Sequence, residues 1–207
     1  MAKDMKLRSW VDASYGVHHD FRGHTGGVIS MGGGILHHKT SKQKLNTKSS
    51  TESELVGASD YLPHTIWFKR FLAQQGYKVK GNFFYQDNVS AIRLGSNGFA
   101  SRGEKSKHIN IRYFFIKDVL NKEEIRLVHC PTTQMVADYF TKPLQGRLFT
   151  KIRDQIMGHA DILAEERVGD KEKGGNINKK MTTKISPGGK NERRMTYAEA
   201  VTQERRM

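Results

Sequence analysis

The spacing of apolar and polar residues over the first 160 positions predicts a mixture of strands and helices. A short apolar run at Leu7–Ala13 predicts a strand near the start of the chain. Glycines interleaved with apolar residues at Gly23–Gly34 predict a hairpin, whose second strand continues through Ile35–Lys39. Two further short apolar runs, Asn82–Gln86 and Glu124–Cys130, predict two later strands.

The clearest predicted helix runs from Ser49 to the residue before Gly76, because apolar residues recur there at helical spacing. Ser49 can cap the first turn, and Glu52 completes a capping box three residues later. Pro63 lies inside the pattern, so a kink or a break is expected near Leu62. Weaker helical patterns follow at 88–94, 108–121, 133–141 and 146–157.

The order of these elements is a β-hairpin region, a helix, a strand, helices, a strand and a helix. This order predicts an α/β fold, a mixed sheet with helices on its faces. After Gly158 the apolar periodicity fades, and residues 167–195 are rich in Lys, Gly, Asn and Thr. Such a segment cannot bury enough apolar surface to offset the entropy lost on ordering. We therefore expect one domain over residues 1–158 and a basic, disordered tail over residues 159–207.

The net positive charge of the chain indicates a candidate partner. The 207-residue chain has a formal net charge of +14, and +11 of it lies in residues 1–158. A basic folded domain attracts polyanions, of which nucleic acid is the commonest, although a merely soluble basic surface is the alternative. The single cysteine, Cys130, excludes a disulfide within the chain. No apolar run reaches membrane-spanning length and no secretory signal is visible, so we expect an intracellular protein, cytoplasmic or nuclear.

Four acidic residues stand at the predicted ends of elements: Asp12, Glu54, Asp87 and Asp138. Hydrolysis of a phosphodiester is helped by two divalent ions, and Mg²⁺ prefers several carboxylates that converge from separate elements. Each acid taken alone is more simply explained as a solvated or strand-end residue. Glu52 competes with Glu54 for the helix position, but the capping box gives Glu52 a structural role.

Five segments in this order resemble the ribonuclease H domain of Ty1/copia-type retroelements. The match covers about residues 7–157. The segments are WVDASYG, KTSKQKLNTKSSTESEL, YQDNVSAI, KSKHINIRYFFIKD and VADYFTKPL. No single segment is specific for this family, but the five segments in this order are.

The resemblance implies an RNase H fold, a five-stranded mixed sheet flanked by helices. It implies that Asp12, Glu54, Asp87 and Asp138 are the catalytic acids and the ligands of two Mg²⁺ ions, with Mn²⁺ as a substitute. The implied reaction is hydrolysis of RNA in RNA–DNA hybrids. Many cellular relatives add a histidine before the last acid, and His129 is a doubtful substitute for it. The implied partner is a reverse transcriptase domain upstream on the same polyprotein, so we expect this chain to be a fragment or a truncated copy.

Several polar residues are candidates for contacts with nucleic acid, although a solvated charged face is the alternative for all of them. They are Lys42, Lys44, Asn88, Arg102, Lys105 and Lys107. Two other functions stay open. One is a catalytically silent remnant that binds nucleic acid or a protein. The other is a transposase or integrase core, which ranks lower because Glu54 has no place in it.

Overall fold

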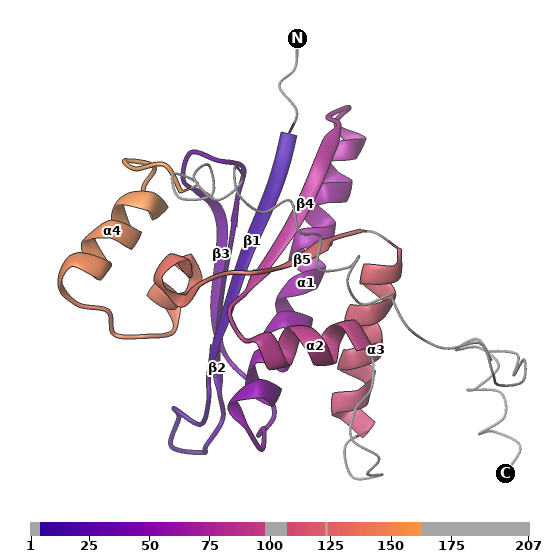
Figure 1. The fold of residues 1–207 in the computed structure, drawn as a ribbon, viewed down its shortest axis with the longest axis vertical. Helices are drawn as coiled ribbons and strands as arrows, with labels where there is room; N and C mark the ends of the chain where they lie inside the picture. Colours follow the sequence, from indigo (N-terminus) through magenta and orange to yellow (C-terminus); the bar gives the residue numbers. More distant parts are fainter. Residues whose placement is uncertain (1–4, 98–106, 123, 163–207) are drawn as a thin grey trace, which may run out of the picture. The chain divides into compact units, whose positions relative to one another are not determined.

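Five strands form one mixed sheet with β1 at its centre, in the order β3-β2-β1-β4-β5 (Figure 1). The computed structural model describes residues 5–97, 107–122 and 124–162. The strands are β1 (Met5–Ser14), β2 (His24–Ser30), β3 (Ile35–Lys42), β4 (Val79–Gln86) and β5 (Arg126–His129). The pairs β1–β2 and β2–β3 are antiparallel, whereas β1–β4 and β4–β5 are parallel. The predicted fold class, an RNase H-like five-stranded mixed sheet with helices, is therefore confirmed.

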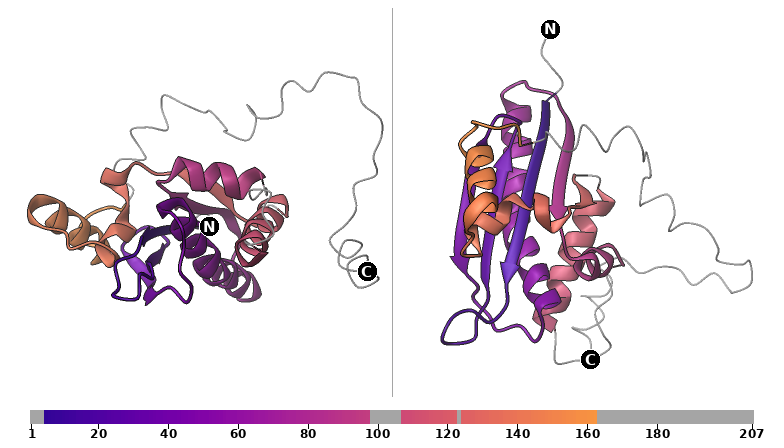
Figure 2. Two further views of the ribbon diagram at one scale, coloured as in Figure 1. Left: turned by 90° about the horizontal axis from the view of Figure 1, so that it is seen from below. Right: turned by 60° about the vertical axis from the view of Figure 1, so that its left-hand side comes forward.

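Helices cover both faces of this sheet, as the two views in Figure 2 show. They are α1 (Ser50–Gln74), α2 (Val89–Asn97), α3 (Lys107–Asn121) and α4 (Gly146–Ile156), with two 3-10 turns, η2 (Thr132–Gln134) and η3 (Val136–Phe140). One buried cluster joins α1 and α3 to the sheet. A second cluster joins the opposite face of the sheet to η3 and α4.

The central strand β1 contributes side chains to both clusters, because successive side chains of a strand point to opposite faces of the sheet. Leu7 and Val11 lie in the cluster under α1, and Trp10 lies in the cluster on the η3 side. By the same alternation Asp12 shares the face of Trp10. Asp12 is thereby carried on the side of the sheet where η3 packs.

The first turn of α1 confirms the predicted cap at Ser49, while the carboxylate of Glu52 bonds the residue before the cap rather than Ser49 itself. Ser49 is the N-cap, and its hydroxyl accepts a hydrogen bond from the backbone N–H of Glu52. The carboxylate of Glu52 in turn accepts the N–H of Lys48 at 2.7 Å. The helix ends as predicted before Gly76, which has φ +82°. It runs without a break through Pro63, so the break considered there does not occur.

The helix predicted over 133–141 is wrong in type, since two 3-10 turns occupy this region. Met135 separates the turns with an extended backbone (φ −76°, ψ 92°), and Pro131 precedes the first of them. After η3 the N–H of Lys142 donates to the carbonyl oxygen of Asp138 at 2.9 Å. This backbone turn brings the side chain of Lys142 next to that of Asp138.

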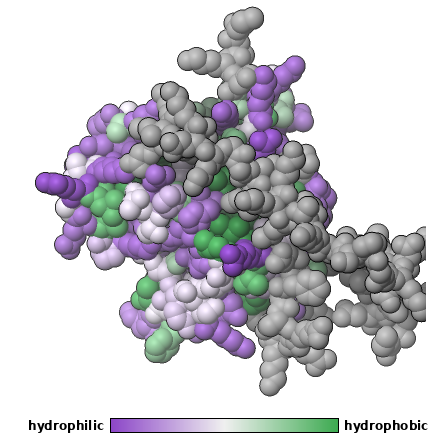
Figure 3. All heavy atoms as spheres, viewed as in Figure 1, coloured by the Kyte–Doolittle hydropathy of each residue, from purple (hydrophilic) through white to green (hydrophobic). Residues whose placement is uncertain are grey.

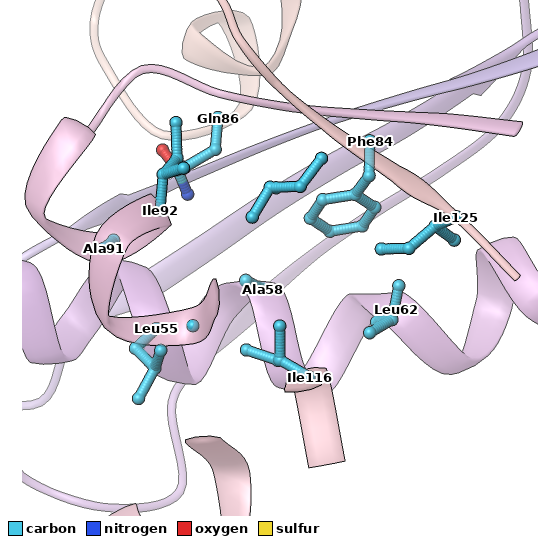
Figure 4. Close-up of a pocket in the computed structure, with 11 residues that line it drawn as sticks. Leu55, Ala58, Leu62, Phe84, Gln86, Ala91, Ile92, Ile116 and Ile125 are labelled. Atoms are coloured by element: carbon cyan, nitrogen blue, oxygen red, sulfur yellow. The ribbon is translucent and has the colours of Figure 1, made fainter. Parts of the chain in front are cut away.

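A small cavity of about 20 Å³ lies between α1, α2, α3 and the sheet. Its wall is almost wholly apolar, and Figure 4 shows the ring of Phe84 facing it with the amide of Gln86 at its edge. An apolar wall offers a water molecule few hydrogen-bond partners. The packing beneath α2 is therefore looser than that of the surrounding core.

The surface carries apolar side chains in small groups. On the face drawn in Figure 3, hydrophobic patches are separated by hydrophilic side chains. None of the helices in the described part of the chain has the length and apolar character needed to cross a membrane. The described chain continues past residue 158 to Ile162, which is buried in the second cluster. The predicted domain boundary stays a prediction, because nearly all of the proposed tail lies outside the described residues.

Candidate acidic metal centre

Three aspartates meet at one end of the sheet. One carboxylate oxygen each of Asp12, Asp87 and Asp138 lies within 4.8 Å of the others. Because β1 and β4 are adjacent and parallel, with Trp10 opposite Tyr85, their carboxyl ends reach the same edge. η3 then brings Asp138 onto this edge, where both Asp138 and Asp12 are buried, at 2% and 1% exposure.

The fourth predicted acid, Glu54, approaches from the first turns of α1. It is buried and is not part of the 4.8 Å group, but Gln86 Nε2 donates to its Oε2 at 3.3 Å. Burial raises the pKa of Glu54 to about 9, and the charges of Asp12 and Asp87 add to the effect. The charges of the four acids therefore act on one another, and Glu54 is protonated at neutral pH in the metal-free chain.

The pKa values of Asp87 and Asp138 are also raised. Burial, and then the charge of Asp12, raise the pKa of Asp87. Burial raises the pKa of Asp138 to about 6, although its hydrogen bond from Lys142 opposes the shift. Negative charge is thus concentrated in a poorly solvated place, and a bound cation would relieve it.

Two residues after η3 contact the aspartates directly. The hydroxyl of Thr141 donates a hydrogen bond to Asp12 Oδ2. Lys142 Nζ donates to Asp138 Oδ1 at 2.8 Å and to Asp12 Oδ1 at 3.3 Å. Burial lowers the pKa of Lys142, but the hydrogen bond to Asp138 and the charge of Asp12 outweigh it, so the pKa is raised. Sequence reasoning missed both residues, although Lys142 lies four positions after Asp138.

Gln86 is the other residue that sequence reasoning missed. Its buried Oε1 accepts the backbone N–H groups of Asp87 at 2.8 Å and Asn88 at 3.1 Å. The side chain of Asn88 accepts the N–H of Ala91 at 3.0 Å and so caps α2. The only signal in the sequence was a polar residue at the end of an apolar strand. Gln86 thus links Glu54 to the turn that carries Asp87.

The 3-10 turn η2 contributes a threonine to this centre. Thr132 Oγ1 donates to Asp87 Oδ2 at 3.4 Å. His129 lies exposed at the end of β5, opposite Gln86 in the strand register, and no hydrogen bond joins it to the four acids. This position is the strand-end location considered for His129.

The predicted nucleic-acid contacts are only partly placed by the structure. Lys42 is paired with Asp20 at 2.7 Å. Lys44 is exposed, and no ion pair joins it to another described residue. Lys107 begins α3, but its side chain is outside the described part. Arg102 and Lys105 also lie outside the described residues.

The donor set fits a hard divalent cation. Mg²⁺ takes oxygen ligands, usually one or two carboxylates completed by water or phosphate oxygens, and three aspartate carboxylates converge here. The ammonium group of Lys142 already shows that the space between Asp12 and Asp138 accepts positive charge. The buried aspartate cluster is therefore compatible with divalent metal binding.

Sequence comparison finds relatives among retrotransposon Pol polyproteins, while no family model matches the chain. The chain is 29% identical over 159 residues to the retrovirus-related Pol polyprotein from transposon TNT 1-94 of Nicotiana tabacum, covering 76% of this chain and 12% of the relative. It is 30% identical over 155 residues to that from transposon RE1 of Arabidopsis thaliana, covering 73% and 10%. It is 23% identical over 148 residues to the transposon Ty1-DR1 Gag-Pol polyprotein of Saccharomyces cerevisiae, covering 70% and 8%. The chain thus spans about a tenth of the length of these relatives.

Comparison of folds finds ribonucleases H. The structure of LC11-RNase H1, isolated from compost, matches with a TM-score of 0.47 and 15% identity, over 64% of this chain and 90% of that one. LC11-RNase H1 in complex with an RNA/DNA hybrid matches with a TM-score of 0.46 and 13% identity, over 65% and 93%.

Proposed function

We propose that this homologue of part of the Ty1/copia-type retrotransposon Pol polyproteins is a metal-dependent endonuclease that hydrolyses RNA in RNA–DNA hybrids. The observation that carries the proposal is the convergence of Asp12, Asp87 and Asp138, with Glu54 beside them. These are the four acids that the resemblance to the RNase H domain implies. Because the chain covers about a tenth of its relatives, only the activity of this domain is proposed.

In this proposal Asp12, Asp87 and Asp138 hold divalent cations, Mg²⁺ or Mn²⁺, and Glu54 completes the set of acids. Bound divalent ions would supply positive charge for the phosphate and activation of the attacking water. The chain's own residues orient the carboxylates. Thr141 fixes one oxygen of Asp12, and Thr132 contacts Asp87. Burial of Asp12 and Asp138 limits competition from water for their oxygens.

The positive charge of the domain supports a polyanionic substrate, since +11 of the +14 net charge falls in residues 1–158. Lys44, six residues before the start of α1, is exposed, so it is the described lysine that we propose contacts phosphate. The segment that carries it is anchored by Gln43, whose amide donates to Ser53 O at 2.9 Å, one residue before Glu54. The reverse transcriptase domain found in complete elements is the proposed partner that would help to position the hybrid.

A cleavage assay with the purified chain tests the proposal. The substrates are an RNA–DNA hybrid, duplex RNA and duplex DNA, each with Mg²⁺, with Mn²⁺ or with chelator. We expect cleavage of the hybrid alone, dependent on metal. Asp87→Asn should reduce the rate by about a hundredfold or more, since even residues that only support a metal ligand are worth about 10–100-fold.

Asp118→Asn is the matched control, because Asp118 is an exposed acid of α3 paired with Lys122 rather than with the acidic centre. Its rate should equal that of the unaltered chain. Cleavage that is undiminished in Asp87→Asn, or that persists in chelator, contradicts the proposal. Tight hybrid binding without any cleavage would instead favour the catalytically silent binding module.

A further inference from the structure

One positively charged side chain reaches into the acidic centre. Lys142 Nζ contacts Asp138 Oδ1 at 2.8 Å and Asp12 Oδ1 at 3.3 Å. Its side chain is 38% exposed, whereas those of Asp12 and Asp138 are 2% and 3% exposed. The ammonium group therefore enters from the rim of a buried pair of acids, and it has a path back to solvent.

The oxygens that Lys142 contacts are the ones a divalent cation would need. The other oxygen of Asp12 already accepts a hydrogen bond from Thr141, which leaves Oδ1 as its more open oxygen. Mg²⁺ lies about 2.0–2.1 Å from its ligands, closer than the ammonium nitrogen lies to either oxygen. Two like charges this close in a buried place repel strongly. Lys142 and the cation would therefore compete for the same place.

We propose that Lys142 is an internal counter-ion, which occupies the carboxylates of Asp12 and Asp138 in the metal-free chain and is displaced when a divalent cation binds. This inference rests on the proposed function, since it takes these aspartates as metal ligands. Two consequences follow. Lys142 stabilises the metal-free fold by offsetting repulsion among the acids, and it weakens metal binding because its own contacts must be broken first.

A purely supporting lysine would behave in the opposite way. If Lys142 held Asp12 and Asp138 in the geometry that metal requires, its loss would weaken metal binding. If it were an ion pair without influence on the centre, its loss would leave metal binding unchanged. The direction of the change in metal affinity therefore separates the three roles.

The first test is a calorimetric titration of the full 207-residue chain with Mn²⁺, without nucleic acid. Lys142→Met keeps the length of the side chain and removes its charge. We expect its Mn²⁺ affinity to rise at least tenfold, or about 1.4 kcal/mol. In chelator its Tm should fall below that of the unaltered chain. The matched control is Lys122→Met, which removes the same charge from an exposed α3 pair with Asp118. Its metal affinity should not change.

A second measurement uses the unaltered chain and so does not depend on the variant folding. Reductive methylation, followed by mass spectrometry, reports how accessible the amine of Lys142 is. We expect saturating Mg²⁺ to increase the methylation rate of Lys142 several-fold and to leave that of Lys122 unchanged. A rate at Lys142 that stays constant while Mg²⁺ binds overturns the proposal.

The outcomes distinguish this inference from the proposed function. If the unaltered chain binds Mn²⁺ and cleaves hybrid, but Lys142→Met binds Mn²⁺ within twofold of it or more weakly, the counter-ion role alone is rejected. If the unaltered chain neither binds Mn²⁺ nor cleaves hybrid, the metal centre and the counter-ion role are both rejected.

Discussion

Gln86 and Glu54 are joined by a hydrogen bond of 3.3 Å from the side-chain amide to the carboxyl group, between a strand end and a helix start. The same amide accepts the N–H of Asp87. One buried side chain therefore fixes an acid from α1 and the backbone of an acid from the β4–α2 turn. Partners that orient metal ligands are typically worth about 10–100-fold in metal affinity or activity.

We expect Gln86→Leu to lower kcat for hybrid cleavage by about 10–100-fold, because Glu54 and the turn at Asp87 both lose their hydrogen bonds. Steady-state kinetics at saturating Mg²⁺ measure this loss. Gln86→Glu retains the acceptor toward Asp87 and should recover part of the rate.

The matched control for this prediction is Gln43→Leu. Gln43 is also a buried amide with two donated hydrogen bonds, to Thr25 and to Ser53 O, but it contacts none of the four acids. Both leucine variants should lose stability, whereas Gln86→Leu should lose far more kcat. Equal kcat values for the two variants would show that Gln86 has only a structural role.

The raised pKa of Glu54 predicts that removing its charge stabilises the metal-free protein. Its pKa is about 9 in the folded chain against an ordinary 4.5, so between these pH values the folded state binds the extra proton. Stability then falls as pH rises through this window, by at most about 1.4 kcal/mol per pH unit. Below about pH 4.5 the carboxyl group is protonated in both states and contributes no pH dependence.

Glu54→Gln should therefore have a higher Tm than the unaltered chain in chelator, with a difference that grows from pH 5 to pH 9. Thermal unfolding at a series of pH values measures it. Mg²⁺ should reverse the order at pH 8, because only the unaltered chain gains the full set of acids. A difference in Tm that is constant across the pH range would contradict this account of Glu54.

The cavity beneath α2 predicts a stabilising substitution (Figure 4). A Cβ added at Gly95 would meet only Ile116 Cγ2, at 3.2 Å, and the adjoining empty space lets that side chain yield. Helical Gly→Ala substitutions gain about 0.5–1 kcal/mol. We expect Gly95→Ala to raise the free energy of unfolding by this amount in urea denaturation.

Gly57→Ala is the comparison for this cavity. A Cβ at Gly57 would lie equally close to its neighbours, at 3.2 Å from both Ala13 and Thr25, but Gly57 does not line the cavity. Overpacking of this kind costs about 1–3 kcal/mol. If both alanine variants are stabilised equally, the cavity is not the reason for the gain at Gly95.

The exposed Lys44 predicts a salt-dependent contribution to hybrid binding. Each phosphate that a lysine neutralises adds about 0.7–0.9 to the slope of log K against log salt. We expect Lys44→Ala, in the Asp87→Asn background, to reduce the slope by about this amount. Lys42→Ala should have a smaller effect, since Lys42 is already paired with Asp20. Fluorescence anisotropy at several NaCl concentrations measures the slopes of both variants. An unchanged slope for Lys44→Ala would show that Lys44 does not contact phosphate.

The sequence allowed most of the fold to be predicted, because local signals and packing agree. The capping box at Ser49 and the apolar stripe of α1 predict the same helix that the core requires. The exception is the segment that carries Asp138, where an apolar pattern at helical spacing becomes two 3-10 turns. Periodicity cannot reveal such a change, because the extended backbone of Met135 interrupts the helix without altering the spacing.

The acidic residues of the centre could be predicted one by one from the sequence, but the side chains that contact them could not. Position and family resemblance indicate Asp12, Glu54, Asp87 and Asp138. The three aspartates converge, and Glu54 lies outside their group but interacts electrostatically with Asp12 and Asp87. Gln86 and Lys142 were missed because their roles depend on partners far along the chain. Lys142, for example, contacts Asp12 across 130 positions.

The four acids come from β1, α1, the β4–α2 turn and η3, so they span most of the described chain. During translation the last of them, Asp138, leaves the ribosome only after the whole sheet has been synthesised. A nascent or prematurely terminated product that ends before η3 would carry three acids and no closed centre. In the proposed nuclease, hybrid cleavage is thus possible only after synthesis has passed this point.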